Sequence, residues 1–153
     1  MPPQYYTEID RKFPVLYLWY SLVETEWTRY GRANVILDNL IAQKKAVPMI
    51  VVMPNNIVGL TPRLEREAVI EKELVADIIP FVEKNYRALS DRNNRAIAGL
   101  SAGGATAFTV GMRQLDKFGS VAEFSTGVFG GLPPHSERRI RALRSREDRA
   151  RHV

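Results

Sequence analysis

Apolar residues along the chain fall into short continuous runs that alternate with longer stretches of helical spacing. Two strong and two weaker runs stand out, at Phe13–Tyr20, Met49–Met53, Arg95–Leu100 and Ser120–Ser125. Continuous runs of this length, without polar alternation, are typical of strands that are buried on both faces of a sheet. These four segments are therefore the predicted strands.

The stretches between the runs predict helices over residues 32–43, 67–86 and 102–115. In the first of them the apolar residues share one broad face: Val35, Ile36, Leu37, Leu40 and Ile41. Pro80 within the second predicts a kink or a break there, because proline lacks the N–H of a helical hydrogen bond. Strands and helices that alternate in this way predict right-handed crossovers and an α/β fold, with a mostly parallel sheet flanked by helices.

Composition narrows the class of protein without changing this fold. The 153 residues are 45% hydrophobic and 25% charged, as expected for one globular domain. No apolar run reaches the roughly 18 residues of a membrane span, and the start lacks a signal-peptide pattern, so we expect no membrane partner and a cytoplasmic chain as expressed. Cysteine is absent and the histidines are His135 and His152, so neither thiolate chemistry nor a metal cofactor is expected.

The basic charge is concentrated at one end of the sequence. Residues 1–136 hold 15 Lys and Arg against 14 Asp and Glu, whereas residues 137–153 hold 7 Arg and 3 acids. We therefore divide the chain into a core domain over 1–136 and an Arg-rich tail over 137–153. Nucleic-acid binding is not the expected function, since the tail has no aromatic residue to stack on bases, but salt-sensitive binding by this tail is kept as an alternative.

The segment with the clearest chemistry is a Gly-x-Ser-x-Gly motif, Gly99 to Gly103, between a predicted strand and a predicted helix. A serine at such a turn has a strained backbone and an exposed hydroxyl, and the glycines let neighbouring backbone pass closely. The helix that follows directs free N–H groups at a developing oxyanion. Ser101 is the candidate nucleophile and the Ala102 N–H a candidate oxyanion donor. The alternative is a glycine-rich turn with an incidental serine.

Several segments in order resemble one esterase family of the α/β-hydrolases, which includes feruloyl and acetyl-xylan esterases and is related to esterase D. They are RKFPVLYL, ETEWTRYGRANVILDNLIAQ, PMIVVMPNN, KELVADIIPFVEKNYRALSDRNNRAIAGLSAGGATAF and DKFGSVAEFSTGV. The resemblance implies hydrolysis of carboxylic esters through an acyl-serine at Ser101, without a cofactor. It also implies a small ester substrate, such as a feruloyl or acetyl ester of a plant polysaccharide.

The sequence departs from the family in ways that generate further expectations. Ser21 stands where the family has a glycine before its second oxyanion donor, and the Leu22 N–H takes the donor position. Strands of the family are missing at both ends, which predicts a truncated fold with exposed edges and a homo-oligomer. Candidates for covering such a surface are Trp19, Tyr20 and Phe129, although a core role is equally open for Trp19.

A triad in this fold needs an acid and then a histidine after the serine. Glu123, on the strand next to the serine strand, is the candidate acid, and His135 in a Pro-Pro-His-Ser loop is the candidate base, with His152 as the alternative. The Arg-rich tail resembles an unrelated or frame-shifted end. If no base is supplied, the chain is a weak or inactive esterase remnant that serves as a binding or assembly module.

Overall fold

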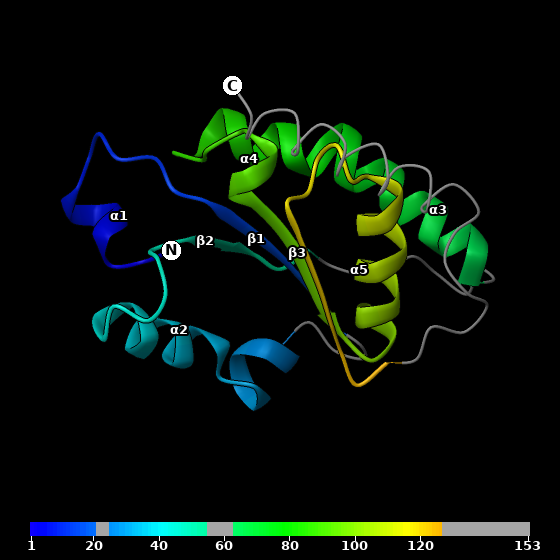
Figure 1. Ribbon diagram of the computed structural model, residues 1–153, viewed down its shortest axis with the longest axis horizontal. Helices are drawn as coiled ribbons and strands as arrows, with labels where there is room; N and C mark the ends of the chain where they lie inside the picture. Colours follow the sequence, from blue (N-terminus) through cyan, green and yellow to red (C-terminus); the bar gives the residue numbers. More distant parts are fainter. Residues whose placement is uncertain (21–24, 55–62, 127–153) are drawn as a thin grey trace, which may run out of the picture.

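Four parallel strands form one sheet in the computed structural model of the protein. The structure describes residues 1–20, 25–54 and 63–126, and for residues 63–66 it describes the backbone but not the side chains. The strands are β1 (Val15–Trp19), β2 (Ile50–Val52), β3 (Arg95–Leu100) and β4 (Ser120–Phe124). Their order is β2-β1-β3-β4, and all three neighbouring pairs are parallel (Figure 1). The predicted α/β fold and its parallel sheet are confirmed.

Helices lie on both faces of this sheet (Figure 1). They are α1 (Gln4–Thr7), α2 (Ala33–Ala42), α3 (Arg63–Glu73), α4 (Ile79–Asn85) and α5 (Ala102–Arg113), with π-type turns at Glu26–Tyr30 and Leu74–Ile78 and a 3₁₀ turn at Arg92–Asn94. The chain moves from β1 to β2 in one direction and from β2 to β3 and β4 in the other. Right-handed crossovers then place α2 on one face and α3, α4 and α5 on the opposite face.

The predicted interruption at Pro80 takes the form of a wider helical turn. The chain runs from α3 through the π-type turn into α4 without a loop, and Pro80 is the second residue of α4. Because proline has no N–H to donate to the preceding helical turn, the regular hydrogen-bond pattern is interrupted there, and the π-type turn lies directly before it. The segment nevertheless stays helical from α3 to α4.

Burial follows the predicted pattern in the two central strands and departs from it at the edge. β1 and β3 are almost wholly buried, but β4 alternates between exposed and half-buried residues because no further strand or helix covers its outer side among the described residues. The prediction of burial on both faces is therefore wrong for β4. The apolar face of α2 is also only partly covered, since Val35 and Ile36 are exposed and Ile41 alone is buried.

Two of the residues proposed to cover an intersubunit surface belong to the core instead. Trp19 and Tyr20 are buried within the chain itself, at 0% and 4% exposure. They are buried because β1 lies between β2 and β3, with helices above and below it. Phe129 lies outside the described residues. The homo-oligomer stays a prediction, and it would have to use other side chains.

A buried arginine fixes the amino-terminal end of β3. Arg95 is 6% exposed, forms an ion pair with Glu83 of α4, and donates to the Ser90 and Lys117 carbonyl oxygens, at 2.5 and 2.7 Å. These contacts join β3, α4 and the segment before β4. Because a buried charge is costly unless it is paired and hydrogen-bonded, removal of one partner would weaken all three segments together.

Tyr17 of β1 provides a test of this packing. Burial raises the pKa of Tyr17 to about 12, against the opposing effect of the Arg95 charge. Between the unfolded pKa near 10 and this value, unfolding releases a proton, so the stability falls as the pH rises, by about 1.4 kcal/mol per pH unit. We predict that Tyr17→Phe removes this part of the pH dependence. Urea unfolding at pH 8 to 11.5 measures it, and equal slopes for both proteins would contradict the prediction.

Candidate active site

The topology places a switch point at the carboxyl ends of β1 and β3. The connection after β1 leads to β2 on one side, and the connection after β3 leads to β4 on the other. In open α/β sheets, ligands bind outside the strand ends where the connections diverge in this way. Ser101 directly follows β3 and Tyr20 directly follows β1, so the predicted nucleophile lies at this switch point.

Ser101 forms a strained turn between β3 and α5. Its φ of 52° and ψ of −116° lie in a region that L-residues seldom adopt, and the residue is exposed. The Ser101 N–H donates to the Phe124 carbonyl oxygen at 2.8 Å, and the Ser101 carbonyl oxygen accepts from the Ala105 N–H at 3.0 Å. The strand–serine–helix geometry predicted from the motif is what the structure has.

The flanking glycines are required by close backbone contacts. A Cβ at Gly99 would lie 2.2 Å from the Gly103 carbonyl oxygen, and a Cβ at Gly103 would lie 2.5 Å from the Tyr20 oxygen. No side chain fits at such distances, because backbone atoms cannot move aside. The first turn of α5 therefore packs directly on the ends of β3 and β1, which holds Ser101 at the edge of the sheet.

One of the two predicted oxyanion donors lies in the described part of the chain. Ala102 is the first residue of α5 and is exposed. Its N–H belongs to the first turn, where N–H groups have no acceptor within the helix and the helix dipole favours negative charge. This is suitable for an oxyanion formed next to Ser101. Leu22 and Ser21, the other residues of the predicted oxyanion hole, lie outside the described residues.

Glu123 is on the strand predicted for it, one residue before the end of β4. Its Cα partner in β3 is Gly99, two residues before the serine. The carboxylate is half-buried, and its Oε2 atom is buried without a hydrogen-bond partner among the described residues. Glu123 is on the α5 side of the sheet, since Val121, two residues earlier, packs against α5 at Gly111. His135 and His152 both lie outside the described residues.

Two aromatic residues near the serine were not selected by the sequence analysis. Phe124 ends β4 and is 51% exposed, and its ring lies 6.4 Å from the Trp27 ring in an edge-to-face arrangement. The Trp27 Nε1–H donates to the Trp19 carbonyl oxygen at 2.9 Å. The position of Phe124 at the end of the strand next to the serine strand was the available signal, but the apolar run around it indicated a buried strand.

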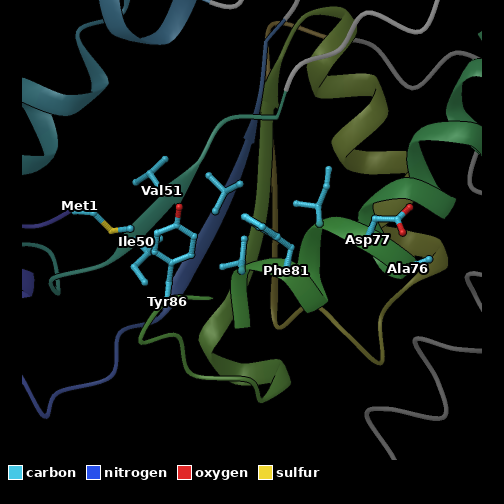
Figure 2. A pocket seen from close by; sticks show the side chains of 10 residues that line it. Met1, Ile50, Val51, Ala76, Asp77, Phe81 and Tyr86 are labelled. Atoms are coloured by element: carbon cyan, nitrogen blue, oxygen red, sulfur yellow. The ribbon is translucent and has the colours of Figure 1, made fainter. Parts of the chain in front are cut away.

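A separate apolar cavity of about 630 Å³ opens beside β2 and α4 (Figure 2). Its lining includes Ile50, Val52, Phe81 and Tyr86, with Asp77 as a charged member. The β2 residues that line the cavity pair with the first residues of β1. The cavity therefore lies one strand away from β3, and not at the carboxyl end of β3 where Ser101 is. Among the described residues that line the cavity there is no serine, cysteine or histidine, and Ser101 is not one of them.

The described residues contain no cluster of histidine and acidic side chains that could hold a metal ion. Across this same part of the chain, no helix is long and apolar enough to cross a membrane.

The contact at Gly103 predicts a stability effect. We expect Gly103→Ala to lower the free energy of unfolding by about 1–3 kcal/mol, because the added methyl group collides with the carbonyl groups at the end of β1. Gly31→Ala is the matched control, since a Cβ there has its nearest neighbour at 3.3 Å and the φ of Gly31 is an ordinary −77°. Urea unfolding of the three proteins measures both changes, and equal midpoints would refute the packing argument.

Comparisons with known proteins agree on one family. The profile of the family described as "Putative esterase" matches residues 1–138. Over 127 residues the chain is 37% identical to an endo-1,4-beta-xylanase/feruloyl esterase of Xylanibacter ruminicola, with 78% of this chain and 17% of that protein covered.

Two solved structures show the same fold. A ferulic acid esterase has a TM-score of 0.67 at 32% identity, over 77% of this chain and 49% of that chain. A ferulic acid esterase from Anaeromyces mucronatus has a TM-score of 0.68 at 26% identity, over 77% and 48%. The chain thus spans about half the length of these structures. Since the family profile covers most of the sequence and the strand–serine–helix turn lies within it, the chain belongs to this esterase family of α/β-hydrolase fold.

Proposed function

We propose that the chain carries the acyl-serine centre of a carboxylic ester hydrolase of feruloyl-esterase type, with Ser101 as the nucleophile. The observation that supports this most strongly is the exposed Ser101 in its strained turn with positive φ, between the end of β3 and the start of α5. The names of the similar proteins include feruloyl esterase and ferulic acid esterase. The proposed substrate is therefore a small feruloyl ester, and an acetyl ester of a plant polysaccharide is the alternative that the family resemblance implies. No cofactor takes part in the proposed reaction.

In the proposed mechanism the Ser101 Oγ attacks the ester carbonyl carbon while a histidine accepts the hydroxyl proton. The Ala102 N–H, together with the Leu22 N–H, stabilises the oxyanion of the tetrahedral intermediate. The C–O bond to the alcohol then breaks, and the histidine returns the proton to the alcohol. Water adds to the acyl-serine in the same way and releases the acid. Each oxyanion donor is expected to contribute about 10²–10³ in rate.

His135 is the proposed base, with His152 as the alternative, and Glu123 is the proposed acid. The partly buried carboxylate of Glu123 supports this role, because its Oε2 atom has no partner in the described structure and could accept from an imidazole N–H. A carboxylate in this position would fix the orientation and the tautomer of the base. It acts through the histidine, so Glu123→Gln is expected to lower kcat more than it raises KM.

Hydrolysis of p-nitrophenyl acetate and methyl ferulate by the purified chain tests the nucleophile. We predict that Ser101→Ala lowers kcat/KM by at least about 10³-fold, because the acyl-serine can no longer form. Ser125→Ala is the matched control: Ser125 is also exposed, directly follows the neighbouring strand β4 and has a φ of 51°. It should leave turnover unchanged.

The same assay with His135→Ala and His152→Ala identifies the base, since only one of them should abolish turnover. If Ser101→Ala hydrolyses both esters as fast as the parent, the proposed function is wrong. The alternative of a non-enzymatic binding or assembly module then stands.

A further inference from the structure

A largely aromatic surface lies on the α2 side of the sheet, at the strand ends next to Ser101; Phe124 is its exposed member, and Trp27 and Leu100 are half-buried. Leu100 and Phe124 are Cα partners on β3 and β4, and both point away from α5, because Ile97 and Val121 on the alternate positions contact α5. The Trp27 ring packs edge to face on Phe124. We call Trp27, Leu100 and Phe124 the aryl platform.

The platform is fixed in place by two hydrogen bonds at the strand ends. Trp27 is held at β1 by the hydrogen bond from its Nε1–H to the Trp19 carbonyl oxygen, at 2.9 Å. Phe124 is held beside Ser101 by the bond from the Ser101 N–H to the Phe124 carbonyl oxygen, at 2.8 Å. The aromatic pair thus reaches from the end of β1 to the end of β4, with the end of β3 between them. A preformed surface of this kind binds a ligand without first being ordered.

We propose that the aryl platform binds the aromatic ring of the substrate's acyl group while Ser101 attacks its carbonyl carbon. This inference rests on the function proposed above and names Phe124 as a specificity-determining residue. Adjacent strands lie about 4.8 Å apart, so the platform is set off sideways from the nucleophile by one strand spacing. That offset suits an aryl ring joined to its carbonyl by a short spacer. Aromatic rings favour edge-to-face or offset contacts with such a surface.

A second exposed aromatic pair in the molecule provides the control. Phe81 of α4 is 58% exposed and lies 6.3 Å from Tyr86, also edge to face, beside the cavity at β2. Each pair joins an exposed phenylalanine edge to face to a second aromatic ring, at nearly the same centroid distance, although Tyr86 is exposed and Trp27 is half-buried. They differ in position, because β1 separates the cavity strand from the serine strand. A ring bound at Phe81 could not present its carbonyl group to Ser101.

Direct binding of ferulate and acetate to the full chain tests the proposal without requiring turnover. Titration calorimetry would compare the parent with Phe124→Ala, Phe124→Leu and Phe81→Ala, and circular dichroism would confirm that each is folded. We expect the Kd for ferulate to rise about fivefold or more in both Phe124 variants, since the ring contact is lost. Phe81→Ala should bind like the parent, and acetate should bind equally weakly to all four proteins.

Unchanged ferulate binding in the Phe124 variants, or a loss in Phe81→Ala, would overturn the proposal, as would a parent that does not bind ferulate. These outcomes are separate from failure of the proposed function. If the parent cleaves p-nitrophenyl acetate through Ser101 but does not bind ferulate, Ser101 is the nucleophile and the proposal for the aryl platform is wrong. If the parent binds ferulate through Phe124 but shows no turnover, the aryl platform is supported and the proposed hydrolase function is wrong.

Discussion

The backbone at Gly103 lies against the carboxyl end of β1, and this contact determines where the serine of the motif can stand. A Cβ at Gly103 would meet the carbonyl oxygens of Tyr20 and Trp19 at 2.5 and 2.7 Å. Helix α5 consequently starts directly at the carboxyl ends of β1 and β3. Ser101, between β3 and α5, has to turn sharply, and its positive φ follows from this requirement. The strained conformation of Ser101 is maintained because hydrogen bonds from its N–H group and to its carbonyl oxygen fix the backbone on both sides of the turn.

The opposite end of β3 is held just as firmly, by the buried guanidinium of Arg95. The strand that leads to the serine is therefore fixed at both ends, by an ion-pair network at its start and by backbone packing at its end. This arrangement would preorganise the proposed site, since Ser101 and the first N–H groups of α5 are positioned by a strand and a helix rather than by a long loop. The proposed function thus depends on packing at both ends of β3.

The sequence could predict those features that depend on local pattern. The strand at Arg95–Leu100 and the start of the following helix at Ala102 agree with the structure, because apolar runs, glycines and helical spacing are local signals. The run around β4 was predicted as a buried strand on the same kind of signal, yet three of the five β4 residues are exposed. The burial of a strand depends on which other elements pack against it, and the local sequence of the strand does not specify them.

The candidate site shows the same limit. Glu123 could be assigned from the sequence to the strand beside the serine strand. The side of the sheet on which it lies follows only from the structure, where Val121, two residues earlier, contacts α5. The contact between Trp27 and Phe124 joins residues far apart in sequence and depends on the order of the strands. Neither residue belongs to a recognisable sequence motif, so the aromatic surface next to the serine could be identified only from the folded sheet.

The central claim is that the strained turn makes Ser101 a reactive nucleophile. The most direct measurement is reaction of the purified chain with diisopropyl fluorophosphate, followed by mass-spectrometric mapping of the modified peptide. The account predicts one equivalent of phosphoryl group per chain, on the peptide that contains Ser101. A chain that stays unmodified, or that is labelled at a different serine such as Ser125, would contradict it.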